Sequence, residues 1–501
     1  MSRKSNNPPR RHTGAIIVMI LLMLCFIAGT VLMIKLCLDI PNQEVSARPG
    51  SSTIQLPTAP EKETAETEAP TETTIPDPVP EHVVSTATIV STGDILMHKP
   101  VIDVNWKKDG YDFESIFRYI AEDVTAADYA VANLETTLAS TDNGYAYAGY
   151  PNFNCPDEIV DGAKEAGFDM LLNANNHSYD TSSVGAHRTI EVIRDRGLQN
   201  LGFVDSEEEK RYVVQEINGI HVGMICYTYE TDNRADTVAL NGLPLKAADK
   251  NLVNAFDYNA LDTFYAELEG HLADMETDGA EATIVYIHWG DEYQLKQNAS
   301  QTKIAQKICD LGVDVIIGGH PHVVQPMELL TSTTDPDHKT VCLYSMGNAV
   351  SNQRQGNLER ITTAHTEDGV LFSVTFSKYS DGTVYLESTD LLPVWVYRRN
   401  NATGNEYNMI PLHLDQADGW QEAYNIQEQT VNAAKNSHAR TMAIVGEGLT
   451  ACQDWLTQQY EAREQYYYDL AWYPEKFATE ATEAPTEAIT EAATEDTQSA
   501  N

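Results

Sequence analysis

The chain has 501 residues and a formal net charge of -41, from 74 acidic and 33 basic side chains. So acidic a chain repels the phosphates of DNA and RNA, and we expect no nucleic acid among its partners. Hydrophobic residues make up 42% of the sequence, and between its two ends nearly 400 residues could form one large domain with additions. The seven cysteines give no pattern of a disulfide framework.

A membrane anchor is predicted close to the N-terminus. Residues 14–34 carry no charge and are dominated by Ile, Leu, Met and Val, which meets the roughly 20 residues that a helix needs to cross a bilayer. A cleaved signal peptide is the alternative, but the apolar run is longer than the usual signal core. Because Arg3, Lys4, Arg10 and Arg11 precede it, residues 1–13 should be cytoplasmic. We expect a single-pass protein of the cell membrane with an extracellular main domain.

Two acidic segments are predicted to be disordered spacers. Residues 35–82 and 478–501 are rich in Thr, Glu, Pro and Ala, and the hexapeptide Thr-Glu-Ala-Pro-Thr-Glu occurs in both, at 67–72 and 482–487. Such a composition buries too little apolar surface to fold. Repulsion between glutamates and the stiffness of proline should extend the first spacer and hold the domain away from the membrane.

An α/β domain is predicted over residues 83–412, followed by a helical extension over 413–477. Candidate helices alternate with short apolar runs, which predicts a mainly parallel sheet covered by helices. These helices are expected at residues 111–123, 157–166, 185–196, 261–276 and 301–311. Residues 369–378 and 383–391 flank Asp381-Gly382 and are typical of an antiparallel hairpin, which fits a second sheet.

Five apolar runs end in residues that can ligate a metal or move a proton. Because ligands gather outside the carboxyl ends of strands in α/β sheets, we expect these side chains to share one site. Any one of these strand ends alone would fit an ordinary turn. The five ends are Gly93-Asp94 with His98, Asn133-Leu134-Glu135, Asn175-Asn176-His177 with Asp180, His288-Trp289-Gly290 with Glu292, and Gly319-His320-Pro321-His322.

The mixture of side chains suits a pair of divalent metal ions. Two ions about 3.5–4 Å apart need a carboxylate that bridges them, neutral imidazoles and an amide oxygen, with positions left open for water and substrate. Nitrogen and oxygen ligands without thiolate favour Mn, Fe or Zn over a structural cysteine site. The candidate ligands are Asp94, Glu135, Asn176, His288, His320 and His322.

These motifs resemble those of bacterial capsule synthesis proteins of the CapA type, which are linked to poly-γ-glutamate and whose domain is similar to calcineurin-like metallophosphoesterases. The resemblance includes Ser91-Thr92-Gly93-Asp94, the other four strand ends and Ser345-Met346-Gly347-Asn348, in the expected order over residues 86–352. It implies a metallophosphoesterase-like sandwich of two β-sheets flanked by helices.

The resemblance also implies a role for each ligand. Asp94 and His322 would hold one metal, and Glu135 would bridge it to the second, which Asn176, His288 and His320 would hold. His177 would protonate the leaving group of a hydrolysed phosphoester, with Asp180 orienting its imidazole. The chain is thus a candidate metal-dependent hydrolase of the metallophosphoesterase type.

The sequence departs from the phosphoesterase pattern near the first strand end. That pattern places a histidine two residues after the aspartate, whereas His98 follows Asp94 by four residues. Two roles therefore stay open for His98, as a metal ligand and as a residue that lines the pocket. Glu292 and Asn348 either line the pocket or support it from behind. Trp289 fits a pocket wall and a core position equally well.

Three functions fit these observations. The resemblance favours a membrane-anchored protein that assists the synthesis or export of poly-γ-glutamate, with this anionic polymer and the capsule synthesis machinery as partners. A surface metal-dependent phosphoesterase and a non-catalytic scaffold or binding domain are the alternatives. An acidic domain repels a polyanion at long range, although bound metals reverse that repulsion locally.

Overall fold

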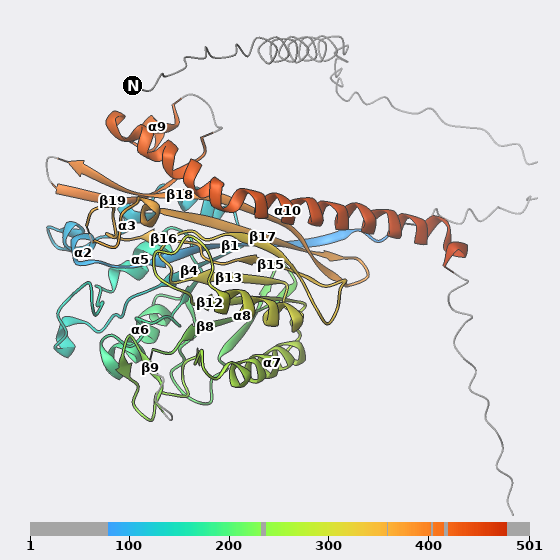
Figure 1. Ribbon diagram of the computed structural model, residues 1–501, viewed down its shortest axis with the longest axis horizontal. Coiled ribbons are helices and arrows are strands. Elements are labelled where there is room, and N and C mark those ends of the chain that lie inside the picture. The colour runs from blue at the N-terminus through green and yellow to red at the C-terminus, as the bar shows by residue number, and fades with distance from the viewer. Residues whose placement is uncertain (1–78, 232–236, 358, 402–403, 415–418, 478–501) are drawn as a thin grey trace, which may run out of the picture. The chain divides into compact units, whose positions relative to one another are not determined.

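Two mixed β-sheets build the centre of the protein, seen in the computed structural model in Figure 1. The structure describes residues 79–231, 237–357, 359–401, 404–414 and 419–477, all in a compact unit that begins at Pro76. The predicted membrane anchor, most of the first spacer and the whole acidic tail lie outside the described residues. Among the described helices, none is both long and apolar enough to cross a membrane.

The first sheet combines parallel strands with a long antiparallel hairpin. Its order is β19 (Gly404–Pro411), β18 (Val384–Asn401), β17 (Asp368–Tyr379), β1 (Val83–Ile95), β4 (Tyr129–Leu134), β5 (Met170–Leu172) and β6 (Gln199–Leu201), and β16 (Asn348–Val350) also pairs with β1. Strands β1, β4, β5 and β6 are parallel, so their carboxyl ends lie at one edge.

The second sheet has the same mixed character. Its order is β11 (Ala255–Phe256), β8 (Ile220–Tyr229), β12 (Ala282–His288), β13 (Val315–Gly319), β15 (Lys339–Leu343) and β14 (Met327–Thr331), and β7 (Tyr212–Ile217) also pairs with β8. Two short hairpins stand apart, β2 (Trp106–Lys107) with β3 (Gly110–Tyr111), and β9 (Ala239–Leu240) with β10 (Leu243–Pro244).

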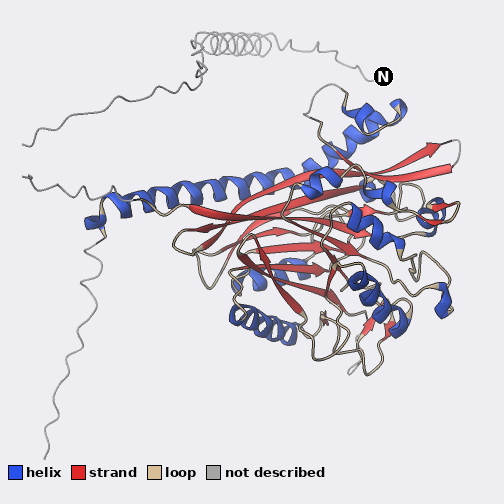
Figure 2. Ribbon diagram, turned by 180° about the vertical axis from the view of Figure 1, so that it is seen from behind, coloured by secondary structure: helices blue, strands red, loops and turns tan. Residues whose placement is uncertain are grey.

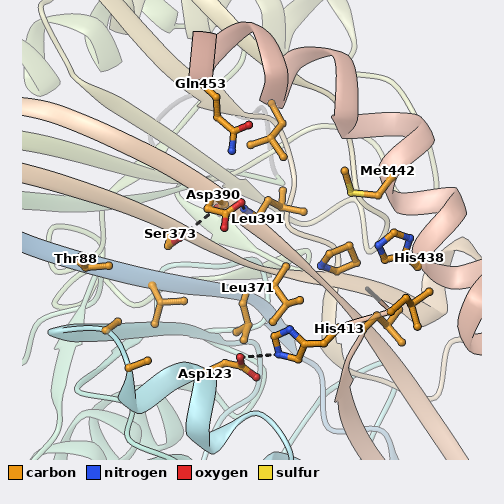
Figure 3. A pocket seen from close by; sticks show the side chains of 18 residues that line it. Thr88, Asp123, Leu371, Ser373, Asp390, Leu391, His413, His438, Met442 and Gln453 are labelled. Carbon is orange, nitrogen blue, oxygen red and sulfur yellow. Dashed lines mark hydrogen bonds and ion pairs between the residues drawn. The ribbon is translucent and has the colours of Figure 1, made fainter. Parts of the chain in front are cut away.

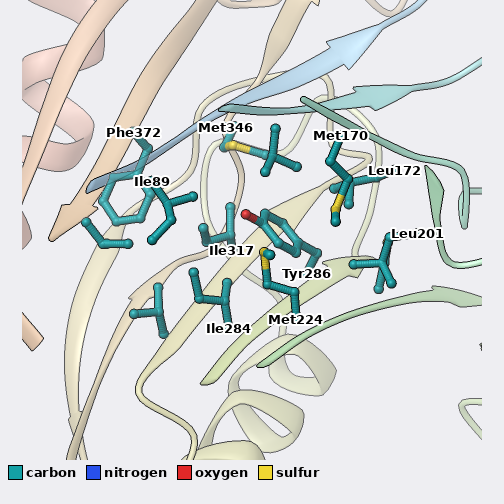
Figure 4. Packing of buried hydrophobic residues seen from close by; sticks show 14 of the residues in the cluster. Ile89, Met170, Leu172, Leu201, Met224, Ile284, Tyr286, Ile317, Met346 and Phe372 are labelled. Atoms are coloured by element: carbon teal, nitrogen blue, oxygen red, sulfur yellow. The ribbon is translucent and has the colours of Figure 1, made fainter. Parts of the chain in front are cut away.

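The main core lies between the two sheets. Ile89 of β1 and Met170 of β5 belong to the same buried cluster as Met224, Ile284 and Ile317 of the second sheet (Figure 4). Because side chains alternate between the two faces of a strand, each buried strand also contributes side chains to a second core on the outer face of its sheet. Burial of each large aliphatic side chain contributes about 1.5–3 kcal/mol, and the sandwich depends mainly on this term.

Helices cover the outer faces of both sheets (Figure 2). The first sheet packs against α2 (Lys99–Val104), α3 (Glu114–Phe117), α4 (Ala121–Thr125), α5 (Glu158–Glu165) and α6 (Ser182–Asp195). The second sheet packs against α7 (Leu261–Thr277) and α8 (Ala299–Asp310). The short helices are η1 (Thr141–Asn143), η2 (His365–Glu367), η3 (Glu428–Thr430), η4 (Pro474–Lys476) and α9 (Trp420–Ala423).

Four of the five predicted helices are confirmed, as α5, α6, α7 and α8, and so is the hairpin of β17 and β18. The helix predicted at 111–123 is wrong. Tyr111 pairs with Trp106 in a β-hairpin, and Asp112 accepts a hydrogen bond from the amide of Glu114, where the short α3 begins. The rest of the segment forms two short helices, α3 and α4, in place of one long helix.

A single long helix, α10 (Val431–Trp472), follows the hairpin and lies along β18 and β14 (Figure 1). In its carboxyl-terminal half, the guanidinium of Arg463 lies 5.1 Å from the ring centre of Tyr379 and 4.1 Å from that of Tyr385, which attaches the helix to the hairpin of β17 and β18. Near its middle, the backbone of Gly448 approaches β14 so closely that an added Cβ would lie 1.7 Å from the carbonyl oxygen of Met327.

We expect Gly448→Ala to lower the free energy of unfolding by about 1–3 kcal/mol, because the methyl group displaces α10 from β14. Gly446 is the matched control. Its added Cβ would lie 3.8 Å from the Cε of Met442, an ordinary contact. Gly446→Ala should therefore raise stability by about 0.5–1 kcal/mol through helix propensity. Urea unfolding of both variants measures the difference, and equal stabilities would contradict this packing argument.

Candidate metal centre

The carboxyl ends of parallel strands from both sheets meet around one cluster of buried side chains. In the first sheet, Asp94 lies at the end of β1, and Glu135 and Asn176 follow β4 and β5. In the second sheet, His288 ends β12, and the turn with His320 and His322 follows β13. The structure thus brings together all six side chains that the sequence marks as ligands.

The ligand atoms form two groups that share one carboxylate. Glu135, His288 and His320 make one group, and Asp94, Glu135 and His322 make the other, with the ligand atoms of each group within 4.8 Å of one another. In the first group, Oε1 of Glu135 is 3.4 Å from Nε2 of His288. In the second group, Nδ1 of His322 is 3.1 Å from Oδ2 of Asp94 and 3.8 Å from Oε2 of Glu135. Glu135 therefore has one oxygen facing each group.

Amide side chains complete the cluster. Oδ1 of Asn176 lies 2.8 Å from Nε2 of His288, which places an amide oxygen beside the first group. Asn133 donates a hydrogen bond of 2.7 Å to Oδ1 of Asp94, and Asn175 donates one of 3.1 Å to Oδ1 of Asn133. This relay fixes Asp94 so that its second oxygen, Oδ2, faces His322.

The cluster fits divalent metal ions. Both carboxylate oxygens of Glu135 and Nδ1 of His320 are buried and have no hydrogen-bond partner, a costly state for polar atoms unless a cation contacts them. Burial lowers the pKa of His288 to about 3 and that of His320 well below its usual value. Both imidazoles are therefore neutral, which is the form that binds a metal.

The turn that carries His320 and His322 has little room for other residues. An added Cβ on Gly319 would lie 3.1 Å from Oδ1 of Asp94 and 3.4 Å from Nδ1 of His288. His320 and His322 both adopt left-handed backbone angles, with φ of 95° and 56°. Such angles cost energy in residues that have a side chain. The strained turn thus presents His320 to one ligand group and His322 to the other.

Tyr229, at the end of β8, holds the ring of His320. Its hydroxyl lies 3.2 Å from Nε2 of His320, and the two ring centres are 4.8 Å apart. When Nε2 carries the ring proton and donates it to Tyr229, Nδ1, which has no hydrogen-bond partner, keeps a lone pair that can bind a metal. Partners of this kind set the tautomer of a metal-binding histidine.

We expect Tyr229→Phe to weaken metal binding at the group that contains His320 by about 10–100-fold, because the imidazole loses the partner that sets its tautomer. Calorimetric titration of the metal-free chain with Mn²⁺ measures this loss. Tyr258→Phe is the matched control, because its hydroxyl accepts a hydrogen bond from the amide of Gly290 and does not contact His320. Equal affinities in both variants would contradict the role given to Tyr229.

His177 and Asp180 form a pair beside the cluster. Nδ1 of His177 lies 2.7 Å from Oδ2 of Asp180, and its Nε2 lies 4.0 Å from Oε1 of Glu135. Asp180 also accepts hydrogen bonds from the amide of Phe153, at 2.6 Å, and from Asn241, at 2.8 Å. These contacts fix the carboxylate, so the other ring nitrogen of His177, Nε2, faces the cluster.

A cavity of about 740 Å³ opens beside His177 and His322. His98 and Glu292 line it, as two of the three predicted pocket residues, and His98 is in neither ligand group. Asn348 does not line the cavity; it donates a hydrogen bond to the backbone carbonyl of His322 from behind. Trp289 is a core residue, with no exposed surface and a hydrogen bond to the carbonyl of Tyr344.

Comparison with known proteins identifies the family. Residues 88–353 match the family model described as bacterial capsule synthesis protein PGA_cap. The matched residues include every ligand candidate. The chain belongs to this family. That result confirms the predicted resemblance to proteins of the CapA type.

Two curated relatives carry matching names. The chain is 27% identical to capsule biosynthesis protein CapA of Bacillus anthracis, over 53% of this chain and 60% of the relative. It is 28% identical to PGA biosynthesis protein CapA of Bacillus subtilis (strain 168), over 52% of this chain and 62% of the relative. The matched region therefore spans about three fifths of the length of these relatives.

A solved structure of a protein from Staphylococcus aureus, named as a 5'-nucleotidase, also matches. It is 15% identical and covers 62% of this chain and 54% of that chain, with a TM-score of 0.37. A TM-score this low carries no inference about fold or activity.

A second cavity, of about 860 Å³, lies between α10, α4 and the first sheet (Figure 3). His413 and Asp123 form an ion pair of 2.8 Å at one side of it, and Met442 and Leu449 of α10 line the other. It contains none of the candidate ligands. The cavity that adjoins the metal centre is therefore the smaller one.

Proposed function

We propose that this protein assists the synthesis or export of poly-γ-glutamate and works through a hydrolytic centre with two divalent metal ions, of the metallophosphoesterase type. The observation that carries the proposal is Glu135, whose two buried oxygens lack a hydrogen-bond partner and face separate ligand groups. Membership of the PGA_cap family supports the capsule role. The ligand set, nitrogen and oxygen without thiolate, fits Mn, Fe or Zn.

The residues divide the chemistry between them. Bound divalent ions would stabilise negative charge on the reacting group and lower the pKa of a water molecule. His177 would hold the proton that the leaving oxygen takes up, because its Nε2 faces the cluster and its Nδ1 is paired with Asp180. The ligands would be Asp94 and His322 for one ion, Asn176, His288 and His320 for the other, and Glu135 for both.

The proposed location is the outer face of the cell membrane. It is supported by the uncharged apolar run at 14–34, by the basic residues before it, and by the acidic spacer at 35–82. The metal centre would then act outside the cell, where an exported polymer and its synthesis machinery meet. Both would be partners of this chain.

A surface phosphoesterase that acts on small phosphorylated molecules is the second candidate function. The cavity of about 740 Å³ beside the metal centre favours it, because this volume suits a small-molecule ligand. Under this alternative the purified protein hydrolyses small phosphoesters, but deletion of its gene leaves the capsule intact.

Capsule formation in the host provides the test. We would delete the gene, restore it as wild type or as Glu135→Gln, and measure surface poly-γ-glutamate. Wild type should restore the polymer and Glu135→Gln should not, although both accumulate to the same level. Glu461→Gln, on the exposed surface of α10, is the control for loss of a carboxylate. If Glu135→Gln restores the polymer fully, the metal centre has no catalytic role in capsule formation, and the protein acts as a scaffold.

A further inference from the structure

The cavity beside the metal centre is larger than the reacting group requires. Its volume of about 740 Å³ lies within the range of about 300–1,000 Å³ of sites for whole small-molecule ligands. Its lining includes the buried side chains of His177 and His322, here called the floor, and the exposed side chains of Tyr150, Glu359 and Arg360, here called the rim. A substrate that reacts at the floor therefore has space for a sizeable second group between floor and rim.

The walls around this second group present aromatic rings with polar tips. The rings of Phe153 and His177 meet edge to face, with ring centres 4.7 Å apart. Tyr293 is fixed more tightly, because it has a left-handed φ of 64°, its amide donates to the carbonyl of Pro321, and its hydroxyl accepts from Gln353. Tyr150 is 75% exposed at the rim. Rings of this kind offer flat apolar faces beside hydrogen-bonding groups.

The charges of the cavity disfavour an anionic second group. Arg360 is the one lysine or arginine among the described lining residues, and it is already paired with Glu292 at 3.2 Å, above the ring of Tyr293. Glu292 and Glu359 outnumber Arg360, so the side chains of the lining carry one excess negative charge apart from the metal ions. The metal ions attract the phosphoryl group at the floor, whereas at the rim Glu359 repels an anionic chain within a Debye length of about 10 Å, where salt screens the repulsion least.

We infer that the substrate is a phosphoester of an uncharged, hydroxyl-rich group of the carbohydrate class, and not a segment of the anionic polymer itself. The inference rests on the proposed function, since it assumes that a phosphoryl group reacts at the metal centre. Hydroxyl groups donate to the carboxylates of Glu292 and Glu359, and the carbon face of a sugar packs on the exposed ring of Tyr150.

The reaction balances with water as the only co-reactant. The water oxygen bonds to phosphorus as the bond from phosphorus to the sugar oxygen breaks. The sugar oxygen takes the proton of His177 and leaves as an alcohol, and a proton from the water restores the histidine. The products are a phosphate and a neutral sugar, so no charge is added to the outer cavity.

Binding of inert analogues to the full chain, purified in detergent with Mn²⁺, tests the inference without turnover. The probes are methylphosphonate, which matches the reacting group alone, the isosteric phosphonate of a hexose 6-phosphate, and a γ-linked glutamate pentamer. Calorimetry should show the hexose phosphonate binding at least about tenfold tighter than methylphosphonate, which corresponds to about 1.4 kcal/mol. The pentamer should bind more weakly than either.

Two variants locate the effect. Tyr150→Ala, at an exposed rim position, should remove most of the advantage of the hexose phosphonate and leave methylphosphonate unchanged. Glu359→Gln should strengthen binding of the pentamer, whereas Glu461→Gln, an equal loss of charge far from the cavity, should not.

A pentamer that binds wild type as tightly as the hexose phosphonate would overturn the inference. So would a hexose phosphonate that binds no better than methylphosphonate. Failure of methylphosphonate and Mn²⁺ to bind at all would instead contradict the proposed function.

Discussion

Replacement of Glu135 by glutamine is expected to reduce bound metal from two equivalents to fewer than one. Both ligand groups contain this residue, and an amide offers one neutral oxygen where the carboxylate offers two charged ones. Even partners of metal ligands change affinity by 10–100-fold, so loss of a shared ligand should cost more than about 100-fold. Elemental analysis of the purified chain after dialysis against Mn²⁺ measures the stoichiometry.

The same variant should also lose the stabilisation that metal provides. Metal at 100 times its Kd adds about 2.7 kcal/mol to the free energy of unfolding of a protein that binds it. A chelator should therefore lower the unfolding temperature of wild type and leave that of Glu135→Gln unchanged. Without metal the variant should be at least as stable as wild type, because burial and the nearby charges of Asp94 and Glu292 raise the pKa of the Glu135 carboxyl well above its usual range.

Glu292→Gln is the matched control, since Glu292 lines the adjoining cavity but belongs to neither ligand group. It should retain two equivalents of metal and the full effect of the chelator. Two equivalents in Glu135→Gln would mean that the carboxylate bridges nothing, and the shared-ligand geometry would be wrong.

Local sequence patterns predict the strand ends of this protein well. The apolar run before Gly319 and the one before Asp94 each form a buried strand, because their length and β-branched side chains leave few alternatives. The order of these strands in two separate sheets follows from long-range pairing, which no local pattern contains. The ligands meet because the carboxyl edges of both sheets coincide.

The residues that sequence reasoning missed act through distant contacts. Tyr229 looks like any tyrosine of a buried strand, and only the fold places its hydroxyl beside His320, 91 residues away. Asn241 likewise reaches Asp180 from a separate hairpin. For His98, the sequence did contain a signal that it lines the pocket and is not a ligand, namely its spacing from Asp94. The two additional residues let α2 begin directly after His98, and the imidazole turns toward the cavity and Phe153.

Removal of the imidazole in His177→Ala is expected to lower kcat by about 10²–10⁴-fold for a phosphoester with a poor leaving group, such as an alkyl ester. The leaving oxygen of an alkyl ester needs a proton as the bond breaks, and Nε2 of His177 is the nitrogen that faces the cluster, with Nδ1 paired to Asp180. For 4-nitrophenyl phosphate the loss should be small, because nitrophenolate leaves without a proton. Metal content should be unchanged.

The dependence on the leaving group distinguishes proton donation from a structural role. Asp180→Asn should produce a smaller loss in the same direction, since it frees the ring of His177 without removing it. His98→Ala is the control, because it removes a second imidazole that packs against the same Phe153, with ring centres 5.1 Å apart, and leaves the pair with Asp180 intact. His98→Ala should change the rates for the alkyl ester and for 4-nitrophenyl phosphate by the same factor, or change neither. If His177→Ala slows hydrolysis of the nitrophenyl ester as much as that of the alkyl ester, His177 is not the proton donor. Its pair with Asp180 would then have a structural role in the metal centre.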